Sequence, residues 1–170
     1  MKYGLMMVLL LTLIVVNGCS KIENANNLTV TVGKENIKCI KLNDANDSFR
    51  DNKKAIFKLA FENNALSDIN YIKNDEKVYL DFGSNPPDKL VIKDSLLYPN
   101  GDYLYTEKET IEVPFIKDGN KFYFIIKKHF ASALSSVYLE NKTDLRGLRI
   151  KASWGKNEYV YALVIKTDAF

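Results

Sequence analysis

The sequence predicts a single antiparallel β-sandwich, on three observations. From residue 28 onwards, apolar side chains recur at every second position far more often than at helical spacing, which is typical of half-buried strands. Turn signals rich in Gly, Pro, Asn and Asp separate these segments. Few stretches have helical periodicity. Short strands about 8–12 residues apart favour a sandwich of the immunoglobulin-like kind, with a small barrel as the alternative.

The chain opens with a short leader. Lys2 supplies one positive charge, and residues 5–16 form an almost uninterrupted apolar segment. This segment is too short to span a bilayer, which takes about 20 apolar residues. A charged start, a short apolar core and small residues before a cleavage site are typical of a secretory signal peptide. We therefore expect residues 1–18 to be a signal peptide.

The end of the leader, Val16-Asn17-Gly18-Cys19, resembles a bacterial lipobox. The resemblance implies that the Cys19 thiol receives a diacylglyceryl group, that the leader is cut before it, and that Cys19 becomes the new N-terminus. Two acyl chains anchor a protein stably, whereas one holds it only marginally. We expect attachment to the extracellular face of the bacterial cell membrane. The alternative is a buried or disulfide-bonded cysteine after a plain signal peptide.

The remaining chain divides into a tether and one domain. Residues 19–27 carry the anchor and are otherwise polar, without an apolar period, which is typical of a tether. Residues 28–170 have a suitable length for one domain with its own core. The whole chain has 24 basic and 21 acidic side chains. This near balance of charge argues against nucleic-acid binding, which needs a basic patch. We also expect the domain to be a monomer.

Strict alternation predicts strands in three segments of the domain. The alternating residues are Leu28, Val30 and Val32; Val78, Leu80 and Phe82; and Ile111, Val113 and Phe115. Cys39 lies in a partly amphipathic segment between the first two. With Cys19 acylated it has no partner for a disulfide, so we expect a free, buried thiol.

Two hairpins follow from turn chemistry. Asp118-Gly119 separates two strand-like segments, and this dipeptide is the strongest short-range hairpin signal. Near the C-terminus, residues 155–158 separate the segments LRGLRIKASW and YVYALVIKT. Alternation places Leu148 and Ile150 on one face of the first segment, and Tyr161 and Leu163 on one face of the second.

Two segments depart from the period of two. Residues 51–64 fit either a helix, with Ile56, Leu59, Ala60 and Asn63 on one side, or a strand, with Phe57, Leu59 and Phe61 alternating. We interpret them as a strand. Further along, three apolar residues at helical spacing predict a short crossover helix between strands. These residues are Phe130, Leu134 and Val137.

The sequence offers no catalytic motif, and we expect no enzyme. His129 is the one histidine, so any Ser-His-Asp arrangement would need it. Its place at the start of the predicted short helix favours a surface or capping role. Ser132 and its neighbours lack the G-x-S-x-G turn that exposes a nucleophile. The alternative is an envelope enzyme or enzyme inhibitor whose chemistry is not visible in the sequence.

We also expect no metal and no cofactor. One histidine and one free cysteine cannot supply the usual zinc ligands. Residues 44–52 imitate a calcium loop, but Phe49 occupies the position that needs glycine and Ala55 the position that needs glutamate. The glycine motifs of nucleotide-binding loops do not occur in the sequence.

Aromatic residues beside turns are the candidates for binding. Tyr98 and Tyr103 flank the turn at residues 99–102, and Trp154 directly precedes the C-terminal hairpin turn. Rigid amphipathic aromatic side chains at loop ends are typical of surfaces that bind proteins and sugars. The alternative is that these side chains are half buried in the sandwich. The expected partner is an envelope protein or a glycan.

Two segments, residues 85–94 (NPPDKLVIKD) and residues 145–170, resemble parts of small lipoproteins of low-GC Gram-positive bacteria with an immunoglobulin-like domain. The role of those lipoproteins is not established, and the resemblance brings no catalytic residue with it. Together with the lipobox, it implies a cell-envelope lipoprotein. We expect its extracellular β-sandwich to act as a binding or interaction module, rather than as a purely structural envelope component.

Overall fold

The computed structural model describes residues 27–42, 56–62, 65–134 and 139–170. The predicted signal peptide, the predicted lipid anchor at Cys19, all of the predicted tether except residue 27, and residues 44–52 lie outside the described residues. Within the described ranges, no helix is long and apolar enough to cross a membrane.

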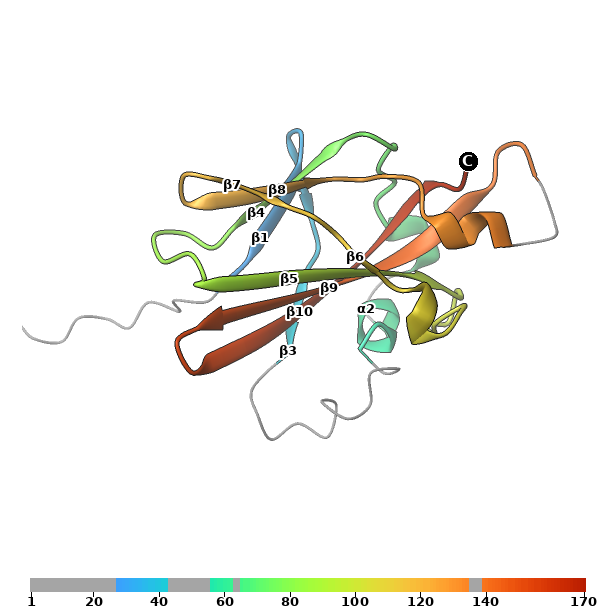
Figure 1. Ribbon diagram of the computed structural model, residues 1–170. Coiled ribbons are helices and arrows are strands. Elements are labelled where there is room, and N and C mark those ends of the chain that lie inside the picture. Colours follow the sequence, from blue (N-terminus) through green and yellow to red (C-terminus); the bar gives the residue numbers. More distant parts are fainter. Residues whose placement is uncertain (1–26, 43–55, 63–64, 135–138) are drawn as a thin grey trace, which may run out of the picture.

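Two five-stranded antiparallel sheets pack face to face, which confirms the predicted β-sandwich (Figure 1). Sheet A contains, in spatial order, β2 (Glu35–Ile37), β1 (Thr29–Val32), β4 (Lys77–Asp81), β8 (Lys121–Ile125) and β7 (Ile116–Asp118). Sheet B contains β3 (Ile40–Leu42), β10 (Asn157–Asp168), β9 (Thr143–Trp154), β5 (Lys89–Leu97) and β6 (Ile111–Glu112).

The main core lies between the sheets and follows the period of two. In β4, Val78 and Leu80 are buried, while the residues between and beside them are partly or fully exposed. The same alternation holds in β8, and the predicted inward faces of β9 and β10 also belong to this core. Each fully buried Leu, Ile or Phe contributes roughly 1.5–3 kcal/mol to the free energy of unfolding.

A second apolar cluster covers the outer face of sheet B. The helix α2 (Lys58–Glu62) and the turn before it place Ile56, Phe57 and Ala60 against Ala162 and Val164 of β10. Of residues 51–64, the described residues 56–62 form a turn followed by α2, so the predicted strand there is wrong. The helix forms here because β10 is apolar on both faces, so that its outer face provides an apolar surface against which one side of α2 packs.

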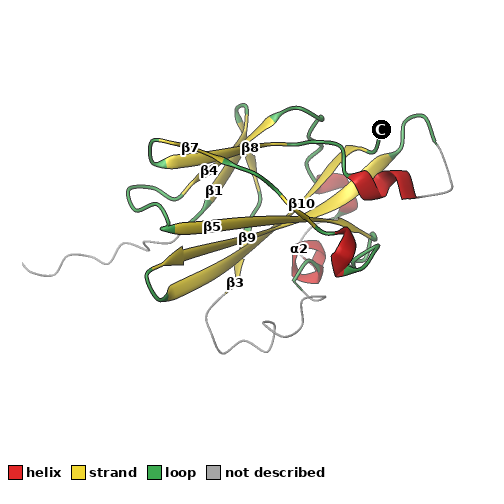
Figure 2. Ribbon diagram, in the orientation of Figure 1, coloured by secondary structure: helices red, strands yellow, loops and turns green. Residues whose placement is uncertain are grey.

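The helical segments gather at one end of the sandwich (Figure 2). They are α2 and the short 3-10 helices η1 (Leu66–Asp68), η2 (Glu107–Glu109) and η3 (Phe130–Leu134). The helix η3 follows β8 of sheet A and precedes β9 of sheet B. It is thus the predicted crossover segment, as a 3-10 helix. Val137, which was expected to extend it, lies outside the described residues.

Both predicted hairpins form with two-residue loops. Asp118 pairs with Lys121 across Gly119, and Trp154 pairs with Asn157 across Gly155. The φ angles of the two glycines are +59° and +57°, in the left-handed region that glycine adopts without steric cost. Glycine at the start of each loop therefore fixes the register of the hairpin.

The segment predicted as one strand around Ile111, Val113 and Phe115 is instead divided between the sheets. β6 pairs with β5 in sheet B, and β7 pairs with β8 in sheet A. Between them, residues 113–115, which we call the strap, cross from one sheet to the other. Pro114 lies in the strap and has no N–H to donate to a strand ladder. The single-strand prediction is therefore wrong at this proline.

Candidate ligand-binding site

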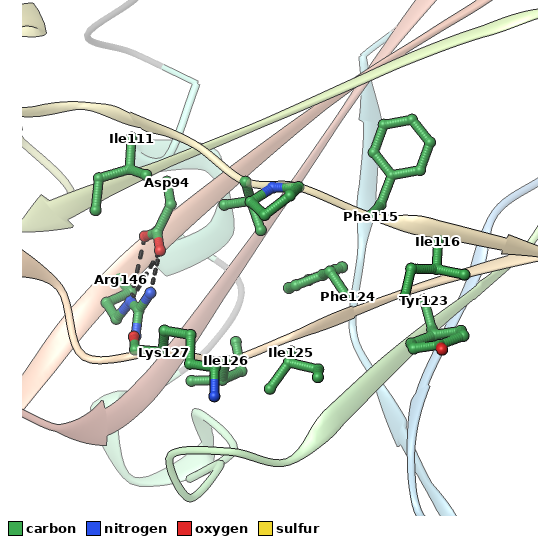
Figure 3. A pocket seen from close by; sticks show the side chains of 12 residues that line it. Asp94, Ile111, Phe115, Ile116, Tyr123, Phe124, Ile125, Ile126, Lys127 and Arg146 are labelled. Carbon is green, nitrogen blue, oxygen red and sulfur yellow. Dashed lines mark hydrogen bonds and ion pairs between the residues drawn. The ribbon is translucent and has the colours of Figure 1, made fainter.

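A cavity of about 240 Å³ opens where the strap crosses between the sheets (Figure 3). One wall consists of the strap with the neighbouring residues of β6 and β7. The opposite wall consists of residues 123–127, from β8 and the chain after it. Asp94 of β5 and Arg146 of β9 complete the lining. The cavity thus lies at the edge of the sandwich where both sheets end.

Large apolar side chains stand exposed beside the cavity. Phe115 is 36% exposed and Ile116 is 53% exposed, although both are bulky and hydrophobic. The edge strands β6 and β7 contain only two and three residues, so each covers only a short stretch of the core on this side. A concave apolar surface with exposed aromatic and aliphatic residues at its rim is the usual form of a ligand site.

A buried ion pair forms the polar end of the cavity. Asp94 is 1% exposed and Arg146 is 3% exposed. Arg146 Nε donates to both carboxylate oxygens of Asp94, at 3.2 and 3.1 Å, and Nη2 donates to Asp94 Oδ2. Figure 3 shows this pair at one end of the cavity and Phe115, Ile116 and Tyr123 at the other. The cavity therefore has a polar end and an apolar end.

Backbone and hydroxyl oxygens hold the guanidinium of Arg146 in place. Nη1 donates to the backbone oxygen of Lys127 at 2.6 Å and to Thr167 Oγ1 at 3.4 Å. Buried ion pairs need such additional hydrogen bonds, because removing both charges from water is costly. The orientation of Arg146 towards Asp94 is consequently fixed by three elements of the fold.

His129 is buried beside this pair and is not a surface residue, so that part of the prediction is wrong. It is 2% exposed, and its Nδ1 accepts a hydrogen bond from the backbone N–H of Ala131 at 3.2 Å. The side chain therefore caps the start of η3, as the capping alternative predicts. Its Nε2 lies 3.4 Å from the backbone oxygen of Asp94. Burial lowers the pKa of His129.

The neighbouring serine and aspartate do not complete a catalytic triad with His129. Ser132 Oγ donates directly to Asp144 Oδ2, and both residues are buried. The two ring nitrogens of His129 contact backbone groups. A triad needs the histidine between the serine and the aspartate. These hydrogen bonds instead hold η3 against sheet B.

The three aromatic residues selected from the sequence do not come together. Tyr98 directly follows the end of β5 at Leu97, whereas Trp154 follows Ser153, the partner of Lys89 at the start of β5. The nine residues of β5 span roughly 27 Å. Tyr98 and Tyr103 therefore lie at the opposite end of the sandwich from Trp154.

Their surroundings also differ. Tyr98 is 48% exposed. Tyr103 packs edge-on against Phe57 with ring centroids 5.6 Å apart, and burial raises its pKa. Trp154 packs against Phe82 and donates from Nε1 to the backbone oxygen of Asn85 at 2.9 Å. Of the three, Tyr98 presents the most accessible side chain.

Tyr123 lines the cavity and Tyr79 lies beside Tyr123, and neither is among the residues predicted to bind. Tyr123 pairs with Ile116 of β7 on one side and with Tyr79 of β4 on the other. The rings of Tyr79 and Tyr123 are 5.6 Å apart, and Lys77 Nζ lies 4.8 Å from the Tyr123 ring centroid. Alternation along β4 and β8 was the available signal, because it places both tyrosines on the face opposite the core.

Cys39 is a free and partly buried thiol packed against the main core. Burial raises its pKa to about 12. The thiolate is the reactive form of cysteine, so burial disfavours reaction of this thiol near neutral pH. As for metals, the residues that the structure describes contain no group of three or more His, Cys, Asp or Glu side chains that could hold an ion.

Comparison of the chain with family models, curated proteins and solved structures gave no significant match.

Proposed function

We propose that this chain is a membrane-anchored cell-envelope lipoprotein whose extracellular β-sandwich binds a partner at the cavity beneath the strap. The single observation that supports binding at this place is the cavity itself, open at the sheet edge and bordered by exposed Phe115 and Ile116. Support for the anchor comes from the lipobox that ends at Cys19. The partner is an envelope protein or a glycan that presents a small group to the cavity.

The volume of the cavity indicates how large a group it admits. An engineered apolar cavity of about 150 Å³ stays dry and binds benzene, and the present one measures about 240 Å³. The space therefore accepts a ring or a branched aliphatic group with a few additional atoms.

The outer face of sheet A extends the proposed contact beyond the cavity. Ile116, Tyr123 and Tyr79 form a continuous row across β7, β8 and β4. Tyrosine combines a broad apolar ring with a hydroxyl, which suits both protein and sugar partners. A partner that inserts a group beneath the strap would lie across this row.

Binding of a plain apolar probe tests the cavity. The full chain in phospholipid vesicles is heated with and without toluene, and unfolding is followed by the fluorescence of Trp154, the one tryptophan of the chain. A ligand that binds the folded state raises the unfolding temperature. We expect toluene to raise it for the parent chain, relative to the same vesicles without toluene.

Two matched variants locate the binding. Val113→Phe places a larger side chain beside the cavity, where Val113 lines the wall, and should abolish the toluene effect. Val91→Phe makes the same change on β5 outside the cavity lining, and should preserve it. Equal toluene effects in both variants, or none in the parent, would contradict binding beneath the strap.

A further inference from the structure

We propose that the cavity selects small neutral groups with an apolar body and a head that both donates and accepts a hydrogen bond, such as a primary amide, whether a partner presents them or they are free in solution. The inference rests on the proposed function and names the ligand class of the same site. It follows from the hydrogen bonds, the charge and the shape of the polar end at Asp94 and Arg146.

The ion pair keeps hydrogen-bonding capacity that the described residues do not use. A guanidinium has five N–H donors. Those of Arg146 reach Asp94 from Nε and Nη2, and reach Lys127 and Thr167 from Nη1. The second N–H of Nη2 has no acceptor among the described residues, so the pair retains a donor.

Asp94 retains acceptor capacity in the same way. An ionised carboxylate has about four lone-pair sites. Within the described part of the chain, its side-chain oxygens accept only from Arg146, and Oδ1 receives only the 3.2 Å contact from Nε. The polar end of the cavity therefore carries one spare donor, on Arg146, and spare acceptor capacity, on Asp94.

The charges at this end disfavour an ionised head group. Asp94 and Arg146 neutralise each other. Lys127 also lines the cavity, but its Nζ forms an exposed ion pair with Asp75 at 2.5 Å. A charged head would be buried without a counter-charge of its own, which is strongly unfavourable. A neutral head avoids this cost and satisfies the spare donor and acceptor.

The shape of the cavity fits a ligand with one polar end. Figure 3 shows Ile125, Phe124 and Ile126 along the middle of the cavity, between the ion pair and the exposed rim. A volume of about 240 Å³ exceeds the roughly 150 Å³ that holds benzene. The volume therefore accommodates one ring with a short head group.

Four probes that share a ring and differ in the head test this selection. Toluene, 4-methylbenzamide, 4-methylbenzoate and 4-methylbenzylamine, protonated at neutral pH, are each titrated against the full chain in vesicles, with Trp154 fluorescence reporting thermal unfolding. We expect 4-methylbenzamide to bind about tenfold more tightly than toluene, as one net hydrogen bond allows. Both charged probes should bind more weakly than toluene.

A double variant assigns the selection to the ion pair. Asp94→Leu with Arg146→Met removes both charges together, which proteins often tolerate, whereas removing one leaves a buried unpaired charge. In this variant the amide should lose its advantage, and toluene should bind at least as well. The ranking of the four probes on the parent chain tests the inference even if the double variant does not fold.

Three results would overturn the inference while leaving the proposed function intact. They are equal binding of toluene and amide by the parent, tightest binding of a charged probe, and an amide preference that survives in the folded double variant. Failure of all four probes to bind the parent would instead contradict the cavity as a binding site, and with it the proposed function.

Discussion

At the scale of single residues, Gly147 of β9 leaves the space that Phe57 fills on the outer face of sheet B. A Cβ atom added to Gly147 would lie 2.6 Å from Phe57 Cζ and 2.8 Å from Leu97 Cδ1. The ring of Phe57 therefore packs directly against the backbone of β9 at Gly147. This contact holds α2, which begins at the next residue, over sheet B. This contact joins residues 90 positions apart in the chain, which is why local periodicity alone led to a strand prediction for residues 51–64.

We expect Gly147→Ala to destabilise the protein by about 1–3 kcal/mol, because overpacking a filled core forces side chains and backbone to shift. Urea unfolding followed by Trp154 fluorescence measures the change. Adding Phe57→Leu should recover part of the loss caused by the alanine, since the smaller side chain frees the space. Equal unfolding midpoints of Gly147→Ala and the parent would contradict the close contact.

His129 makes stability depend on pH. Burial lowers its pKa below the ordinary value of 6.5, so the unfolded chain takes up a proton at a higher pH than the folded chain does. The contribution of neutral His129 to the stability of the folded protein is therefore complete above pH 6.5. This contribution is lost as the pH falls towards the lowered pKa of the folded state.

Urea unfolding of the parent at pH 7.5 and pH 5.5 should show lower stability at the acidic pH. His129→Asn can still accept from Ala131 N–H but does not titrate, so its stability should fall less over the same interval. If parent and variant lose stability equally between the two pH values, the loss does not arise from His129.

At the scale of elements, the sequence predicts those strands and turns whose conformation depends on residues close together in the chain. The alternation along β4 and the glycines of the two hairpins are local signals, and the structure contains both. The division of the segment around Pro114 does not follow from a local signal, because it depends on the pairing of β6 with β5 in sheet B and of β7 with β8 in sheet A. Pro114 indicates a break in a ladder, but not that the chain changes sheet there.

The hairpin between β7 and β8 should depend on the left-handed conformation of Gly119. An added Cβ at this position meets no atom within 4 Å, so any effect comes from the backbone. Gly119→Val should destabilise by about 1–2 kcal/mol, because a β-branched residue is strained at positive φ. Gly119→Asn is the control and should cost less, since asparagine tolerates this region. Equal urea midpoints for the two variants would contradict this account of the turn.

At the scale of the whole molecule, the cavity is a property of the sandwich and not of any one segment. Its lining comes from both sheets and from the strap that joins them. Tyr98, Tyr103 and Trp154 could be predicted as binding residues because aromatic residues beside turns are visible in a sequence. Asp94 and Arg146 could not, since their pairing depends on the register between β5 and β9, in which Arg146 lies opposite Leu96.

The proposed anchor predicts the location of the whole protein. Cys19→Ala should block lipid attachment and leave uncleaved precursor, or protein released to the medium. Detergent phase partitioning, gel mobility and metabolic labelling with a radioactive fatty acid measure this. Cys39→Ala is the matched control and should behave as the parent does. A Cys19→Ala protein that partitions and migrates like the parent would contradict the lipoprotein proposal.

The most direct test of binding at the cavity is a crystal structure of the protein soaked with toluene. We predict electron density for the ring between the strap and residues 123–127, with the Asp94–Arg146 pair intact at the polar end. The contrary result would be a cavity filled by the protein's own side chains, with Phe115 turned inward from its exposed position and no density for toluene beneath the strap.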